Sequence, residues 1–213
     1  MHAPTLQRAL RHLTLAVALA GAAAAAAAAP GYHVEIDTSR FSGAGFLDFV
    51  FIPGNSGAPA ASATLRHVSG AFGGVVAQEG DVSGAVGGVL SLRNGGFYNG
   101  LFQSIALGGQ FSFDVEFGGA FQFADGGAGS TFGVGLLDAS GARYLGNPGG
   151  NVVQFELMPA FGGAPAGVSG AVYGGVATIA AVPEPGAWLM LSAGLALLGW
   201  GARRRRGVEA RAA

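Results

Sequence analysis

Two carboxylates, Asp114 and Glu116, are the residues of this chain that most resemble a catalytic pair. In an extended strand, residues two positions apart project from the same face at about 7 Å, a separation within the broad range used by glycoside hydrolases. Residues 111–117, however, alternate strictly between apolar and polar side chains. The polar side of such a strand usually faces solvent, and nothing nearby in the sequence would separate the two acidities. We therefore expect no catalytic residues and no enzyme activity, and a secreted hydrolase ranks behind the alternatives below.

Few histidines and no lysines are available for catalysis or metal binding. Beyond the N-terminal region only His33 and His67 occur, and they fall on different predicted strands without a third partner at metal-ligand spacing. We expect both to be exposed strand residues. The chain has no lysine, which excludes Schiff-base chemistry, and no cysteine, so disulfides cannot stabilise it. No cofactor is expected.

Calcium is a more plausible ligand, because oxygen ligands at strand ends can stabilise an extracellular domain that lacks disulfides. The candidate ligands are Glu79 and Asp81, with Glu35, Asp37 and Asp125 as further acidic groups near predicted turns. None of them matches an ordered calcium-loop motif. They remain weak candidates for a stabilising ion.

Aromatic residues near turns suggest carbohydrate binding. Phe97, Tyr98 and Tyr144 are the candidate sugar-stacking residues, and Tyr173 is a further one. Amides near them could hydrogen-bond to hydroxyl groups; the candidates are Asn94, Asn99 and Gln103. The alternative is that these rings cover the core or brace a hairpin. A lectin-like module, which calcium could stabilise, is therefore one hypothesis for the function.

The elements that must position these residues are β-strands. Residues 111–117 and 32–37 alternate with period two, whereas 45–52 is apolar on both faces apart from Asp48 and predicts a central strand packed on both sides. Further strands are predicted at 63–68, 74–78, 88–93, 101–107, 131–138, 152–157 and 171–179. Residues 138–143 and 94–96 contain turn-forming residues and are predicted to close hairpins. The prediction is a single all-β domain, an antiparallel β-sandwich or jelly-roll-like fold.

The charge of this domain limits its partners. Residues 31–181 contain four arginines against ten acidic residues, a net charge of 4 − 10 = −6, although the whole chain is near neutral at −1. An acidic surface does not release counterions from a phosphate backbone, so nucleic acid is not an expected partner.

The N-terminal region has the layout of a secretory signal peptide. Arg8 and Arg11 precede an apolar stretch at 13–20, and an alanine tract at 22–29 offers small residues for cleavage. We assign residues 1–29 to this signal peptide, with signal peptidase as a processing partner. The exported domain then covers residues 30–181.

The C-terminal region combines a proline-rich hinge, an apolar segment and a basic cluster. Val182, Pro183, Glu184 and Pro185 form the hinge, since proline lacks an N–H donor and restricts the residue before it. The uncharged residues 187–202 follow, and at about 1.5 Å per residue they span about 24 Å as a helix, short for a membrane core of about 30 Å. The membrane stop is formed by Arg203, Arg204, Arg205 and Arg206. A single transmembrane helix with a short cytoplasmic tail at 207–213 is predicted.

These parts in this order resemble the PEP-CTERM sorting signal of Gram-negative bacteria, also labelled an ice-binding protein C-terminal domain, here at residues 182–206. The resemblance implies recognition by an exosortase, a membrane transpeptidase-like enzyme, and cleavage near the motif. It predicts an exported protein held transiently in the inner membrane by its C-terminal helix and then released to the cell surface or extracellular matrix. The function it favours is a surface or matrix protein associated with exopolysaccharide or biofilm, in a structural or adhesive role; the lectin-like module is the alternative.

Overall fold

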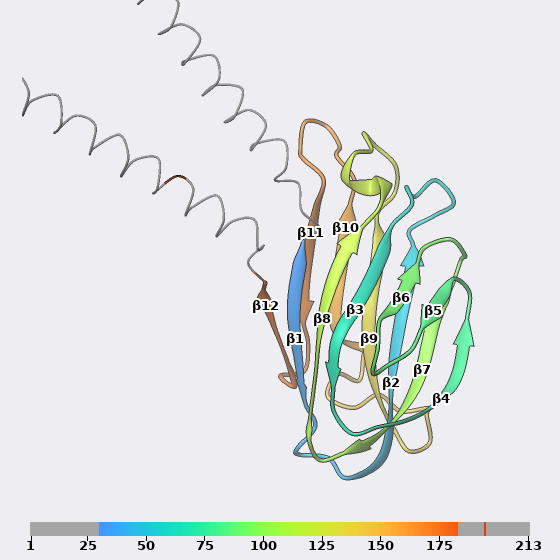
Figure 1. The fold of residues 1–213 in the computed structure, drawn as a ribbon, viewed down its shortest axis with the longest axis vertical. Coiled ribbons are helices and arrows are strands. Elements are labelled where there is room, and N and C mark those ends of the chain that lie inside the picture. Colours follow the sequence, from blue (N-terminus) through green and yellow to red (C-terminus); the bar gives the residue numbers. More distant parts are fainter. Residues whose placement is uncertain (1–29, 183–193, 195–213) are drawn as a thin grey trace, which may run out of the picture. The chain divides into compact units, whose positions relative to one another are not determined.

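Alternation of buried and exposed side chains along the chain produces a fold built almost entirely of β-strands (Figure 1). The computed structural model describes residues 30–182 and residue 194. Within 30–182 there are twelve strands and one short 3₁₀ helix, η1. Their bounds are β1 Gly31–Asp37, β2 Gly43–Pro53, β3 Ser62–Ser69, β4 Phe72–Glu79, β5 Val82–Gly84, β6 Leu90–Arg93, β7 Asn99–Leu107, β8 Gln110–Gly118, η1 Ala120–Gln122, β9 Ser130–Asp138, β10 Asn151–Met158, β11 Gly167–Val172 and β12 Ala177–Ala181.

The strands form two six-stranded sheets in which every neighbouring pair is antiparallel. Sheet A has the order β12-β1-β8-β3-β6-β5, and sheet B has the order β11-β10-β9-β2-β7-β4. Only the connections β5–β6, β9–β10 and β10–β11 stay within one sheet. All the others cross between the sheets, so residues far apart in the sequence become neighbours at the ends and on the faces of the strands.

The core lies between the two sheets and is rich in phenylalanine. In β8 the apolar side of the alternation, from Phe111 to Phe117, is buried as predicted. Phe117 packs against Phe155 of β10 with the ring centroids 4.9 Å apart, and against Phe132 of β9 at 5.9 Å. Phe113 meets Phe49 of β2 edge-on at 5.8 Å. These rings join sheet A to sheet B, and the prediction of an all-β antiparallel fold is confirmed.

The structure differs from the predicted secondary structure in three details. Residues 171–179 are not one strand: Gly174 and Gly175 adopt φ of +70° and +63°, and the turn carries the chain from β11 in sheet B to β12 in sheet A. The turn at 94–96 joins β6 and β7, which lie in different sheets, and so does not close a hairpin. The short strand β5 was not predicted.

Strand β2 is central, as predicted, with β9 on one side and β7 on the other. Its Leu47, Phe49 and Phe51 point into the core. Within residues 30–182, however, no second layer covers its opposite face. Asp48 and Val50 instead line a hollow on the outer face of sheet B.

The targeting segments predicted at the two ends lie outside the described residues. They comprise the signal peptide at 1–29, nearly all of the apolar segment at 187–202, the arginine cluster and the tail at 207–213. In the part of the chain that the structure describes, no helix has the length and apolar character needed to span a bilayer.

Candidate functional site

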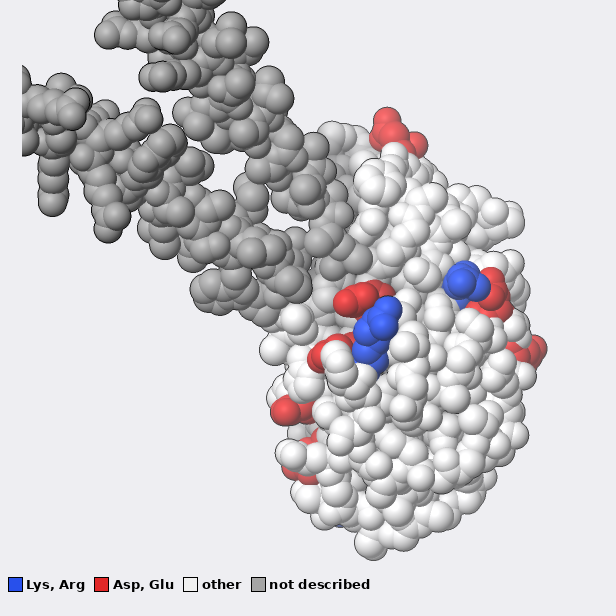
Figure 2. All heavy atoms as spheres, in the orientation of Figure 1, with Lys and Arg blue, Asp and Glu red and all other residues white. Residues whose placement is uncertain are grey.

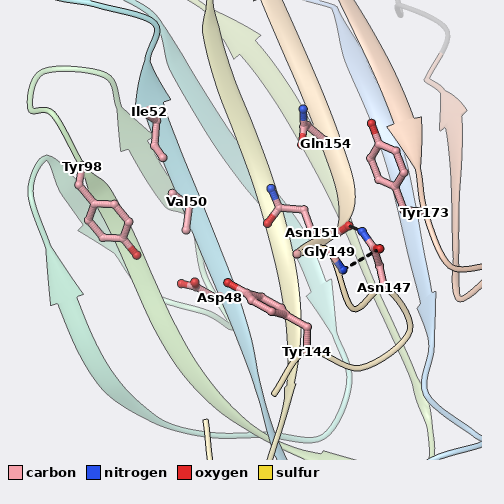
Figure 3. Close-up of a pocket in the computed structure, with 11 residues that line it drawn as sticks. Asp48, Val50, Ile52, Tyr98, Tyr144, Asn147, Gly149, Asn151, Gln154 and Tyr173 are labelled. Atoms are coloured by element: carbon pink, nitrogen blue, oxygen red, sulfur yellow. Dashed lines mark hydrogen bonds between the residues drawn. The ribbon is translucent and has the colours of Figure 1, made fainter. Parts of the chain in front are cut away.

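The hollow on sheet B is the best-formed candidate site. It measures about 450 Å³ and opens to solvent over β2, β9 and β10 (Figure 3). This volume lies in the range of small-ligand pockets, about 300–1,000 Å³. The residues that line it are Asp48, Val50, Ile52, Tyr98, Tyr144, Asn147, Gly149, Gly150, Asn151, Gln154 and Tyr173.

Strand β2 forms the floor of this pocket, and glycines stand beside it on both neighbouring strands. Val50 pairs with Gly100 of β7 on one side and with Gly133 of β9 on the other. Asp48 pairs with Gly135 of β9. Because these positions carry no side chain, the outer surface of the sheet stays low here and leaves room for rings to lie flat on it.

Side chains from elsewhere occupy the space over these glycines. A Cβ added to Gly135 would lie 3.0 Å from Cε1 of Tyr144, and one added to Gly100 would lie 2.8 Å from Cε1 of Tyr98. At Gly133 it would overlap the side-chain amide of Asn151. The pocket therefore depends on glycine at several positions of two different strands.

Three tyrosines form the walls, each from a different loop. Tyr98 precedes β7, Tyr144 follows β9, and Tyr173 follows β11; their exposed fractions are 37%, 37% and 41%. The turn at 138–143 returns Tyr144 to the C-terminal end of β9, where it forms an antiparallel bridge with Leu137. The amide of Tyr173 donates to the carbonyl of Val152 at 2.9 Å. Half-exposed tyrosines around a polar hollow can pack a face against a sugar and still offer a hydroxyl group.

Amide side chains supply the remaining polar surface. Nδ2 of Asn147 donates to the carbonyl of Asn151 at 2.6 Å, and Oδ1 of Asn147 accepts from the amide of Gly149 at 3.2 Å, so Asn147 braces the loop before β10. Nε2 of Gln154 donates to Oε1 of Glu156 at 2.7 Å. In Figure 3 Asn151 and Gln154 stand on the same side of the hollow as Tyr173.

Asp48 dominates the electrostatics of the pocket. Burial raises the pKa of its carboxyl group from 3.8 to about 6, and no described residue supplies a hydrogen bond or positive charge that offsets this. Figure 3 shows Asp48 between the hydroxyl ends of Tyr98 and Tyr144. Burial also raises the pKa of Tyr98, and the negative charges of Asp48 and Glu79 add to that effect.

A second polar cluster lies on the outer face of sheet A, and the sequence did not predict it. Nδ1 of His33 is 2.6 Å from Oδ1 of Asp114, and Nδ1 of His67 is 2.7 Å from Oδ2 of the same carboxylate. Glu35 is also close, with Oε1 3.6 Å from Nε2 of His33. The two histidines expected to be separate thus share one aspartate.

A β-bulge brings this cluster together. His33 is the direct cross-strand partner of Asp114, but Arg66 occupies the corresponding position on β3. The register shifts between Arg66 and Ser69, and His67 has a positive φ of 50°, unusual for a residue with a side chain. Together they aim His67 at Asp114, which simple alternation along β3 does not predict.

The carboxylate pair considered for glycoside hydrolysis belongs to the same face. Burial acts to raise the pKa of Asp114, but hydrogen bonds from His33 and His67 outweigh it and lower the pKa below its usual range. Glu116 lies beside Arg66, with Nε 3.8 Å from Oε2. A carboxyl group with a lowered pKa does not suit the general acid of this reaction, which must hold a proton near neutral pH.

The calcium candidates are not assembled into a ligand set. Oδ1 of Asp81 accepts a hydrogen bond from Nη1 of Arg93 at 3.4 Å, and Glu79 ends the edge strand β4. Within residues 30–182, no group of three or more histidine or acidic side chains stands where it could hold a metal ion.

The other predicted sugar-binding residues lie apart from the tyrosine pocket. Phe97 is 89% exposed and lines a separate hollow of about 420 Å³ near Asn94. Asn99 is buried: its Nδ2 donates to the carbonyl of Phe51 at 2.9 Å, and its Oδ1 accepts from the amide of Asp81 at 2.8 Å. Gln103 is also buried and donates to the carbonyl of Gly73 at 2.8 Å. Asn99 and Gln103 therefore stabilise backbone groups instead of facing a ligand. Asn94 lines the second hollow, where its Oδ1 accepts from the amide of Ala61 and its Nδ2 donates to the carbonyl of Pro59, each at 2.8 Å.

Basic side chains are few on the described surface and are paired. Figure 2 shows one face on which charged groups are sparse and blue groups lie beside red ones. The arginines of 30–182 contact, in order, the carbonyl of Gly174 (Arg40), Glu116 (Arg66), Asp81 (Arg93) and Asp138 (Arg143).

The fold and site together define an antiparallel two-sheet protein with an aromatic, acidic pocket on one outer face. Comparison with known families adds the C-terminal region: residues 181–206 match the model of the PEP-CTERM protein-sorting motif. This confirms the resemblance seen at Val182–Pro185 and the arginine cluster, so the chain carries a PEP-CTERM protein-sorting motif at residues 181–206. The motif implies processing by an exosortase, export and sorting to the cell surface. No curated protein and no solved structure matches the chain significantly.

Proposed function

We propose that this protein is a carbohydrate-binding component of the bacterial surface or extracellular matrix. In this proposal, signal peptidase removes residues 1–29, the apolar segment at 187–202 holds the protein in the inner membrane, and an exosortase then releases it at the PEP motif. The two-sheet domain next contacts exopolysaccharide in an adhesive role. The sorting motif supports the first part of this proposal, and the pocket supports the second.

The observation that carries the binding function is the convergence of Tyr98, Tyr144 and Tyr173 around one polar hollow. Their loops are separated along the chain, and a core-covering role does not explain why each ring remains more than a third exposed. Aromatic rings supply apolar faces and the nearby amide groups supply hydrogen-bond partners, which together suit a sugar ring with its apolar face and hydroxyl groups.

The test is binding of purified protein to the exopolysaccharide of its host. We expect Tyr144→Ala and Tyr173→Ala each to weaken retention on an exopolysaccharide gel by about tenfold, since aromatic packing contributes about 1 kcal/mol or more. Phe161→Ala is the matched control, because Phe161 is 74% exposed and lies outside the pocket. Retention that is unchanged in both tyrosine variants would refute this site.

A structural role in the matrix is the second candidate, and the edge strand β4 favours it. Seven of its eight residues are exposed, including Val75 at 50% and Val76 at 56%, and its outer edge pairs with no other described strand. Exposed apolar edges can pair between molecules. If they do so here, light scattering shows concentration-dependent association that Val75→Lys abolishes; a monomer at all concentrations excludes this role.

A further inference from the structure

The tyrosine pocket carries negative charge and no positive charge. Of the eleven residues that line it, Asp48 is the only charged one. Glu79 lies close enough to act on Tyr98, since its strand pairs with β7 at Gly100, over which the ring of Tyr98 lies. A ligand of this pocket therefore meets the carboxylate of Asp48, with the negative charge of Glu79 behind Tyr98 adding to the field.

The basic side chains nearest to the pocket along the chain are engaged elsewhere. Nε of Arg143, next to Tyr144, is 3.1 Å from Oδ2 of Asp138. Nη2 of Arg40 donates to the carbonyl of Gly174, next to Tyr173, at 2.8 Å. The negative charge of Asp48 is thus left uncompensated within the described residues, and burial without a partner is costly for a carboxylate.

We propose that the pocket selects a saccharide with a protonated amine, such as a hexosamine unit whose amino group is free, and that Asp48 receives the ammonium group. This inference rests on the carbohydrate-binding function proposed above and adds the class of sugar. The ammonium supplies the missing counter-charge, and tyrosine rings attract cations through the negative potential of their faces. A uronic acid, in contrast, places a carboxylate against Asp48, so acidic polysaccharides are rejected.

The experiment compares three oligosaccharides of equal length by calorimetry: one of glucosamine, one of N-acetylglucosamine and one that contains glucuronate. The full chain is used in a detergent without a sugar headgroup, at about pH 7 where aspartate is ionised. We expect the glucosamine oligomer to bind about tenfold more tightly than its acetylated form, as for a charged hydrogen bond, and the glucuronate oligomer to bind most weakly.

Asp48→Asn is the matched variant, because it removes the charge and keeps the shape. We expect it to lose the preference for glucosamine while retaining affinity for the acetylated oligomer. Equal affinity of the unmodified protein for the amine and the acetylated oligomer overturns the inference but leaves carbohydrate binding intact, as does tighter binding of glucuronate. No binding of any oligosaccharide overturns the proposed function itself, and this inference with it. The comparison in the unmodified protein decides the matter even if the variant fails to fold.

Discussion

Asp48→Asn should stabilise the protein at neutral pH, although it removes a group proposed to bind ligand. The carboxyl group has a pKa of about 6 in the folded protein, against 3.8 ordinarily, because burial disfavours its charge. The folded protein therefore holds this proton more tightly than the unfolded chain does. Below about pH 4 the group is protonated in both states and its effect vanishes; as pH rises to about 6 the free energy of unfolding falls, and above that the full cost is present.

The size of the effect follows from the two pKa values. At about 1.4 kcal/mol per pH unit their difference corresponds to about 3 kcal/mol. Asp48 is only partly buried, so solvent screening reduces the expected gain to roughly 1–2 kcal/mol. The assay is urea unfolding followed by circular dichroism at a series of pH values from about 4 to 7.5.

Asp138→Asn is the control, since its effect has the opposite sign. A hydrogen bond from Ser140 is the main cause that lowers the pKa of Asp138, so its carboxylate stabilises the fold above the ordinary pKa and that contribution is lost as pH falls. Asp138→Asn should therefore destabilise the protein at neutral pH. The reasoning about Asp48 is refuted if Asp48→Asn is no more stable than the unmodified protein at pH 7 and shows the same slope with pH.

Four further predictions concern the pocket, the core packing, the surface cluster and the sorting motif. Gly135→Ala places a methyl group against the ring of Tyr144 and should weaken sugar binding by about tenfold in calorimetry; undiminished affinity would show that the floor need not be flat. Phe117→Ala removes a ring that contacts Phe132 and Phe155 and should cost about 3–5 kcal/mol in urea unfolding, whereas Phe161→Ala should change stability by less than about 0.5 kcal/mol. Asp114→Asn should lower stability at neutral pH, because the carboxylate accepts from both His33 and His67; no change there would mean that the cluster is energetically neutral. Replacing residues 203–206 by serine should cause unprocessed protein to accumulate in cell fractions. Release at the normal level would show that sorting does not require the arginines.

Strand positions could largely be predicted from the sequence because the side-chain period of a strand is a local property. The alternation from Phe111 to Phe117 located β8, and the predicted strands at 32–37, 101–107, 131–138 and 152–157 each coincide with an observed strand. Errors arose where a local pattern was ambiguous. The Gly-Gly turn at 174–175 interrupts a run that still reads as one strand, and the apolar outer face of β2 suggested a second layer where the chain forms a pocket floor.

The sites were less predictable because they combine residues from separate parts of the chain. Tyr98 and Tyr144 were identified as sugar-stacking candidates, and the structure places both in one pocket, whereas Phe97, adjacent to Tyr98, lies elsewhere. In the sequence, Asp48 differs from its neighbours only as the single charged residue of the apolar strand at 45–52. That exception was the available signal: a charged residue in a central strand must face either a partner or solvent.

By itself, the sequence determined the sorting motif, the all-β class and the acidic character of the exported domain. These depend on residue order and composition over short stretches, and they need no knowledge of which strands pair. Only the tertiary structure decided which residues meet. Most connections cross between the two sheets, so strand order brings Tyr98, Tyr144 and Tyr173 to the pocket that Asp48 also lines, and a one-residue bulge turns His67 toward Asp114. Both outcomes depend on register between distant strands, which local periodicity does not encode.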